Sequence, residues 1–151
     1  MLIGLFLFNK IQRHAPLNEV TLLFLISCLI NTHTYVGLFD TFNWMKTTTD
    51  TELFIGVLIY KNVFVPLLIT CFSFLIDRNP RTKKILFLIL FTLIILCVDL
   101  INVFQGLYSF KQWNHFYTII YFSIFLFTIL VILKWYRGLV LSSGGKNNVV
   151  D

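Results

Sequence analysis

Two charged side chains interrupt otherwise apolar segments of this chain, and both are of types that do chemistry. Lys61 lies within LIYKNVFVPLLIT, residues 58–70, and Asp99 lies within an apolar run that begins at Ile85. A lysine and an aspartate in apolar surroundings can pair with each other, hold a charged ligand or carry a proton. Lys61 can also extend its amine to the edge of a membrane, whereas the shorter side chain of Asp99 needs a partner or a proton.

These two charges are predicted to lie at the same depth. Lys61 precedes Ile76 by fifteen residues and Asp99 follows Ile85 by fourteen. At the rise of an α-helix, both then lie roughly 21–22 Å from the same end of adjacent antiparallel helices. We therefore expect a structural ion pair between Lys61 and Asp99, with a lysine that only reaches for the interface, or a ligand-binding or proton-carrying role, as the alternatives.

Other polar side chains are predicted to share this depth and to line one small cavity. On each helix they recur at helical spacing and so occupy one face, and polar faces of membrane helices point into the bundle. Together with the two charges, the candidate ligand-binding residues are Asn31, Thr34, Lys61, Asp99, Asn102, Tyr117 and Tyr121. The simpler interpretation is that the asparagines and threonines hydrogen-bond between helices and that the tyrosines pack in the bundle.

Four apolar segments must position these residues, near 20–39, 53–76, 85–108 and 113–134. Each has about the 20 residues that a helix needs to cross a bilayer, and none alternates with the period of two of a barrel strand. Of the 151 residues, 58% are hydrophobic and only 13% are charged, which is typical of a membrane protein. The predicted fold is therefore all-α, with a four-helix transmembrane bundle in residues 16–137.

The basic residues predict the orientation of this bundle. Nine of the twelve lysines and arginines lie in the N-terminal segment, in the 77–84 connection and in the C-terminal segment, and two lie in the other connections. The positive-inside rule therefore predicts that both termini are cytoplasmic, with a cell (inner or plasma) membrane favoured over an organelle. Residues 1–15 are predicted to form a short interfacial amphipathic helix, and residues 138–151 a disordered polar tail.

Several classes of site are not supported by the sequence. It contains no H-E-x-x-H, no G-x-S-x-G, no phosphate-binding loop and no dinucleotide-binding fingerprint. The three histidines lie too far apart to form a metal site, and the three cysteines form no CxxC pair. We therefore predict no cofactor and no metal ion. The net charge of +5 points to membrane headgroups rather than to nucleic acid.

Three functions are compatible with these features. The favoured one is a non-enzymatic membrane subunit, accessory protein or immunity-type protein that acts through its transmembrane surface on another membrane protein. The first alternative is a binder or transporter of a lipid or small molecule that uses the polar cavity around Lys61 and Asp99. The second is an intramembrane enzyme with Asp99 as acid or base and with Lys61 or Tyr121 as the second group. Membrane lipids are expected partners in each case.

Overall fold

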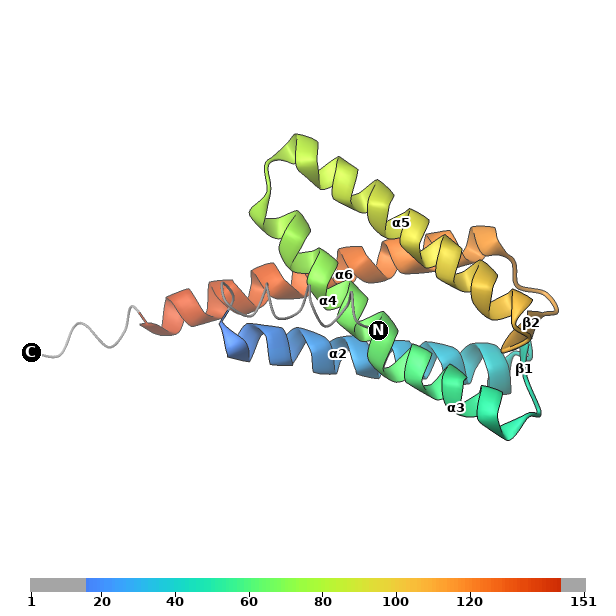
Figure 1. The fold of residues 1–151 in the computed structure, drawn as a ribbon. Helices are drawn as coiled ribbons and strands as arrows, with labels where there is room; N and C mark the ends of the chain where they lie inside the picture. Colours follow the sequence, from blue (N-terminus) through green and yellow to red (C-terminus); the bar gives the residue numbers. More distant parts are fainter. Residues whose placement is uncertain (1–15, 145–151) are drawn as a thin grey trace, which may run out of the picture.

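Four long helices make up the fold (Figure 1). The computed structural model describes residues 16–144. Its helices are α2 (Leu17–Val36), α3 (Thr51–Ile59), α4 (Val65–Arg78), α5 (Arg81–Phe104) and α6 (His115–Gly144), with the π-helical turns η1 (Gly37–Thr41) and η2 (Tyr60–Phe64). Turn η1 continues α2, and η2 joins α3 to α4 without a break.

Each of these four continuous helices is long and apolar enough to cross a membrane. The four predicted segments are thereby confirmed as helices, although the helix ends differ from the ends of the apolar runs. Helix α5, for example, already includes Lys83 and Lys84 in its first turn, because charged side chains can extend into solvent without disturbing the backbone hydrogen bonds. It ends at Phe104 rather than at 108, because Gly106 has a φ of +72° that leaves the helical region.

Helix α6 extends beyond its predicted end and continues to Gly144. The prediction of a disordered tail is therefore wrong for residues 138–144. The apolar residues Leu139 and Val140 continue the helix, and the glycine-rich sequence that suggested disorder comes only at its end. The predicted interfacial helix at 1–15 and the remainder of the predicted tail lie outside the described residues.

A two-stranded antiparallel ribbon joins two connections at one end of the bundle. Strand β1 (Met45–Thr47) precedes α3 and pairs with strand β2 (Tyr108–Phe110), which precedes α6. The carbonyl of Trp44 extends the pairing by accepting hydrogen bonds from two backbone amides that follow β2. The sequence did not predict this ribbon, because three-residue strands are too short to show a period of two. We call this end the ribbon end, and the opposite end, where residues 79–80 turn the chain from α4 into α5, the hairpin end.

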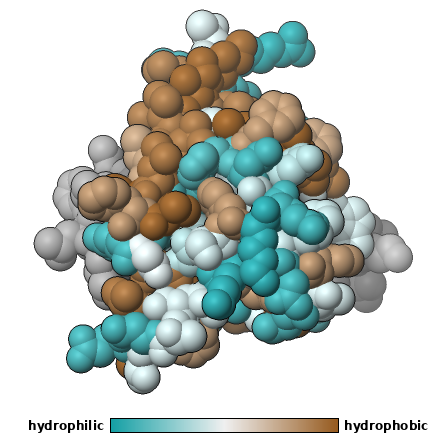
Figure 2. Space-filling model, turned by 90° about the vertical axis from the view of Figure 1, so that its right-hand side faces the viewer, coloured by the Kyte–Doolittle hydropathy of each residue, from teal (hydrophilic) through white to brown (hydrophobic). Residues whose placement is uncertain are grey.

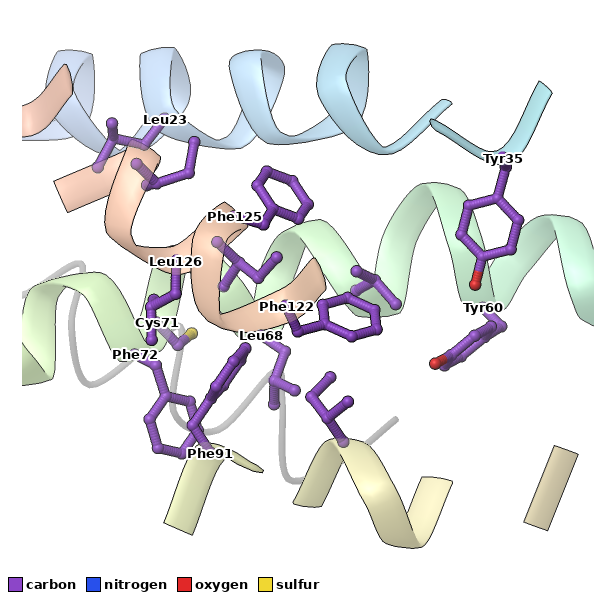
Figure 3. Packing of buried hydrophobic residues seen from close by; sticks show 14 of the residues in the cluster. Leu23, Tyr35, Tyr60, Leu68, Cys71, Phe72, Phe91, Phe122, Phe125 and Leu126 are labelled. Atoms are coloured by element: carbon purple, nitrogen blue, oxygen red, sulfur yellow. The ribbon is translucent and has the colours of Figure 1, made fainter. Parts of the chain in front are cut away.

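Helix α4 lies at the centre of the fold and packs against α2, α5 and α6. Every residue from Val65 to Phe74 except Leu67 is buried. The ring of Phe72 lies 5.3 Å from that of Phe91 in α5, and Figure 3 shows side chains of all four helices meeting in this region. Close packing around one central helix therefore determines how the other three are arranged.

Arg137 of α6 joins three helices at the hairpin end. Its Nε and Nη2 donate hydrogen bonds to Glu19 of α2 at 2.8–3.1 Å, and its Nη1 donates to Asp77 of α4. The side chains of Glu19 and Asp77 are only 12% and 15% exposed, so these charge-assisted bonds are partly shielded from water. No residue of α5 takes part in this cluster within the described chain.

Helix α5 is covered along a single stripe. Its buried residues are Phe91, Ile95, Asp99 and Asn102, which lie from the middle of the helix towards the ribbon end. None of the residues from 81 to 90 is buried, and Ile85 and Leu86 are 65% and 62% exposed. Figure 1 shows the α4–α5 hairpin leaning away from α2 and α6 at this end. The half of α5 near the hairpin end therefore leaves most of its apolar surface uncovered.

Candidate functional site

Asp99 is the centre of a hydrogen-bonded cluster at the ribbon end. The residue is only 3% exposed. Its Oδ1 accepts a hydrogen bond from the hydroxyl of Tyr108 in β2, and its Oδ2 lies 2.8 Å from Nδ1 of His115 at the start of α6. The side chain of His115 is 40% exposed, so it connects the buried carboxylate with the surface. Both carboxylate oxygens thus have partners that come from outside α5.

Lys61 and Asp99 do not form the predicted ion pair. The amine of Lys61 instead lies over the ring of Tyr35, 5.2 Å from the ring centroid, which is within the range of a cation–π interaction. Helical rise gives the position of a residue along the helix axis but not its direction around the axis. Lys61 faces α2, whereas Asp99 faces β2 and the start of α6. The prediction was wrong for this reason, although the two residues do lie in the same half of the bundle.

Three buried tyrosines lie between Lys61 and Asp99. Tyr35, Tyr60 and Tyr108 are 7%, 8% and 3% exposed, and the side chain of Tyr60 interacts with those of the other two. Figure 3 shows the hydroxyl of Tyr35 directed towards Tyr60. Because Tyr108 also donates to Asp99, phenol groups connect the buried carboxylate with the ring that lies under Lys61.

Asn31 holds α2 against the irregular turn η2. Its amide is fully buried, and its Nδ2 donates a hydrogen bond to the carbonyl of Lys61. Carbonyls in this turn need such partners, because the π-helical geometry changes the bonding pattern and Pro66 has no N–H to donate. The carbonyl of Asn62 accordingly accepts from the thiol of Cys28 at 3.4 Å. The geometry thus gives Asn31 a structural contact between helices.

Three other candidate residues also lie in the interior. Tyr121 donates a hydrogen bond from its hydroxyl to Oδ1 of Asn31 at 3.3 Å. Thr34 bonds the carbonyl of Ile30 on its own helix. Asn102 is 7% exposed, and its Nδ2 has no hydrogen-bond partner among the described residues. Most of the polar layer is therefore occupied by contacts within the protein itself.

Tyr117 is the candidate residue that does not face the interior. It is 45% exposed, and the neighbouring Thr118 is buried in its place, where its hydroxyl accepts a hydrogen bond from the indole of Trp113. The predicted face of α6 rested on the spacing of Tyr117, Tyr121 and Thr128. That spacing cannot distinguish an inward-facing residue from a residue near the exposed end of the helix.

Two separate cavities replace the single polar cavity that was predicted. One, of about 20 Å³, is lined by Asp99 and Tyr121 among others and has room for about one water molecule. The other, of about 120 Å³, is lined by Lys61, Asp40 and Thr47 and by apolar residues of α2, η1 and α3. Tyr35 lines both cavities and therefore separates the surroundings of the lysine from those of the aspartate.

The cluster around Asp99 can exchange protons and donate or accept hydrogen bonds. The carboxylate and the imidazole of His115 are an acid–base pair that solvent can reach from the histidine side. Within residues 16–144, no three histidine, cysteine, aspartate or glutamate side chains come together in a way that could hold a metal ion. The absence of a metal or cofactor from the protein's function stays a prediction.

Sequence reasoning missed Tyr108 and His115, the two residues that contact Asp99. They follow it by nine and sixteen residues, beyond the end of α5. The β-ribbon brings the connection back over the end of the helix, and this ribbon was not predictable. The available signal was a tyrosine and a histidine in a short connection close to a carboxylate that needed a partner.

Tyr108 should make the stability of the fold sensitive to alkaline pH. Its burial, together with the nearby Tyr35 and Asp99, holds its pKa well above the ordinary value. The unfolded chain releases this proton near pH 10 whereas the folded chain keeps it, so stability that is present below about pH 10 is lost as the pH rises further. We expect the melting temperature in mild detergent to fall less steeply from pH 9 to pH 11 in Tyr108→Phe than in the parent.

Circular dichroism at 222 nm measures this melting. Tyr117→Phe is the matched control, because it removes an exposed hydroxyl at the same end of the fold. Its pH profile should follow that of the parent. If the melting temperature falls equally steeply with pH in Tyr108→Phe and in the parent, the alkaline sensitivity does not come from Tyr108.

Comparisons of the chain with protein-family models, with curated proteins and with solved structures found no match. Function is therefore inferred from the geometry described above. Two arrangements bear on it most directly, namely the hydrogen-bonded cluster around Asp99 and the uncovered half of α5.

Proposed function

We propose that this chain is an integral membrane protein with four spans and with both termini in the cytoplasm of a cell. Four helices have the length and apolar character that spans require. The hairpin end carries Arg78, Arg81, Lys83, Lys84, Lys134 and Arg137, whereas the ribbon end carries Lys46 and Lys111. Figure 2, which looks onto the ribbon end, shows a band of hydrophilic side chains across the centre and hydrophobic ones mainly above it and to its left. The excess of basic residues supports a cytoplasmic hairpin end.

Within that membrane we propose that the protein acts as a non-enzymatic subunit, accessory protein or immunity-type protein. The polar residues near the ribbon end mostly bond other groups of the protein, and the cavity beside Asp99 has room for only about one water molecule. Neither Lys61 nor Tyr121, the two groups considered as catalytic partners of Asp99, hydrogen-bonds to it within the described chain. This arrangement supports a stabilising role for the cluster rather than a reaction or a transport path.

The observation that carries the proposal is the uncovered half of α5. The arginine cluster ties α2, α4 and α6 together at the hairpin end without this helix. From 81 to 90, apolar side chains are exposed around most of the helix, and this exposure continues at Leu93. A membrane helix associates with others mainly through packing, so a segment with free surface on several sides is well suited to bind a partner helix.

Photo-crosslinking in the cells that naturally produce the protein tests this proposal. A photoreactive amino acid replaces Leu86, Ile89 or Leu93 on α5 in one set, and Leu25 or Leu29 on the exposed face of α2 in a matched set. After irradiation, the tagged protein is purified under denaturing conditions and separated by size. We expect one discrete protein adduct from the α5 positions and none from the α2 positions.

Both sets place the photoreactive group on an exposed apolar face of a span, so contact with lipid is common to them. Protein adducts of the same size and yield from both helices, or none from either, would contradict the assignment of α5 as the partner-binding surface. A discrete adduct restricted to the α2 positions would show that the partner binds α2 and not α5.

Lipid binding is a second candidate function, and one feature of the structure favours it. The cavity beside Lys61 is larger than the one beside Asp99 and contains charged groups of both signs. Its chemistry is specific enough to identify a class of ligand.

A further inference from the structure

A pocket of about 120 Å³ lies between α2–η1 and α3–η2 near the ribbon end. One wall is formed by Tyr35 and Phe39, and the other by Phe54, Val57 and Leu58. This volume has room for about four water molecules at liquid density, and the van der Waals volume of a phosphoethanolamine group is of the same order. The side chains of Phe54 and Leu58 are also exposed on the outside of the fold, at 41% and 37%. The pocket is therefore open at the side of the bundle, where lipids lie.

Lys61 supplies the positive charge in this pocket. Its amine packs over the ring of Tyr35, and no carboxylate of the described chain forms an ion pair with it. An ammonium group has three donors, and the ring occupies one face of it without accepting a conventional hydrogen bond. Lys61 is thus a half-buried cation that is positioned for an anion by the protein but is not neutralised by it.

Asp40 supplies the negative charge, and it lies nearer the end of the bundle. It follows Tyr35 by five residues along α2 and η1, so it lies roughly 7 Å closer to the ribbon end than the ring beneath Lys61. The two charges interact electrostatically without direct contact. The pocket therefore presents a cation on the inner side and an anion on the outer side, with mostly apolar walls that also include Thr47.

This order of charges matches one class of lipid headgroup. In a zwitterionic phospholipid the phosphate lies next to the glycerol and the ammonium lies further out. We propose that this pocket binds the headgroup of a phosphatidylethanolamine, with Lys61 on the phosphate and Asp40 on the primary ammonium. Charge-assisted hydrogen bonds form at both ends. Phosphatidylglycerol can present its phosphate to Lys61 in the same way but lacks the ammonium for Asp40, while the quaternary ammonium of phosphatidylcholine has no N–H to donate.

Native mass spectrometry of the purified full chain, released from detergent micelles, measures this preference. The probes are phosphatidylethanolamine, phosphatidylglycerol and phosphatidylcholine with identical acyl chains. We expect the parent to bind phosphatidylethanolamine about tenfold more tightly than either of the others, since each charge-assisted hydrogen bond contributes about that factor. Lys61→Met should lower the affinity for phosphatidylethanolamine about tenfold. Asp40→Asn should remove the preference for phosphatidylethanolamine over phosphatidylglycerol.

Matched controls remove the same charges at the same end of the bundle but outside the pocket. Lys46→Met pairs with Lys61→Met, and Glu52→Gln pairs with Asp40→Asn, because Lys46 and Glu52 are exposed and do not line the pocket. Equal binding of the three lipids by the parent would overturn the proposal, as would equal effects of a pocket variant and its control. If Lys61→Met does not fold, Lys61→Arg, which keeps the charge, must retain phosphatidylethanolamine binding, and Asp40→Asn must lose the preference.

Discussion

Replacing Asp99 with leucine is expected to lower the free energy of unfolding by about 3 kcal/mol. The effect of this substitution should change when His115 is also replaced, but not when Lys61 is also replaced. The substitution keeps the volume of the side chain similar but leaves the hydroxyl of Tyr108 and the imidazole of His115 without their acceptor. Each unsatisfied buried donor costs about 1–3 kcal/mol, and the exposed histidine can recover part of its loss from water. The total is therefore dominated by Tyr108, which is 3% exposed.

A double-mutant cycle separates the two possible partners of Asp99. Unfolding in mild detergent with increasing denaturant is measured for Asp99→Leu, for His115→Gln, for Lys61→Met and for the two doubles that contain Asp99→Leu. Residues in contact couple by about 0.5–3 kcal/mol, whereas residues without shared partners are additive within about 0.5 kcal/mol. We expect a coupling of at least about 1 kcal/mol with His115 and none with Lys61.

Glu52→Leu is the matched control for this cycle, because it removes an exposed carboxylate at the same end of the fold and outside both cavities. Its effect on stability should remain within about 0.5 kcal/mol. A larger coupling of Asp99 with Lys61 than with His115 would show that the carboxylate and the lysine interact directly after all.

Arg137→Met should have the second large effect, with a loss of about 2–3 kcal/mol. The change leaves two mostly buried carboxylates, those of Glu19 and Asp77, without the cation that holds them together. Breaking a fully buried ion pair costs about 3–5 kcal/mol, and the partial exposure of Arg137 reduces that figure. Arg137→Lys should recover only part of the loss, because an ammonium cannot reproduce the planar fork that contacts both partners.

Lys134→Met is the control for the arginine, since Lys134 lies about one turn earlier on α6 and is exposed. It removes one positive charge from the same end of the same helix. The same denaturant titration should show a change within about 0.5 kcal/mol. If Lys134→Met is as destabilising as Arg137→Met, the net charge of this end matters and the specific contacts do not.

The helices were predictable because each leaves a strong signal over many residues. An apolar run of about 20 residues has few alternatives to a long helix, so the number and approximate positions of the helices follow from composition alone. The ends were not predictable in the same way. Polar residues such as Lys83 can belong to a helix, as they do at the start of α5. A segment with apolar residues such as Leu139 can extend a helix beyond the end of the membrane-spanning run, as it does in α6.

The sequence predicted how far along their helices the candidate residues lie, but not which way their side chains point around the helix axes. Asn31, Asp99 and Asn102 were expected in the interior and are buried there. The pairing of Lys61 with Asp99 failed because it required both side chains to point at each other, and rise per residue contains no such information. His115 could not be assigned because its contact depends on how a connection of ten residues, 105–114, folds back over α5. Its path is fixed by pairing with a strand that lies more than fifty residues away in sequence.

The β-ribbon also bears on the order in which the protein assembles. Its two strands belong to different helical hairpins, one formed by α2 with α3–α4 and the other by α5 with α6. In the proposed membrane orientation, each strand must reach the far side of the membrane with its own hairpin before the two can pair. In that orientation the two strands pair only after both hairpins have inserted. They must separate again before either hairpin can leave the membrane. Its backbone amides should accordingly gain protection from hydrogen exchange after those of the helices during synthesis into nanodiscs.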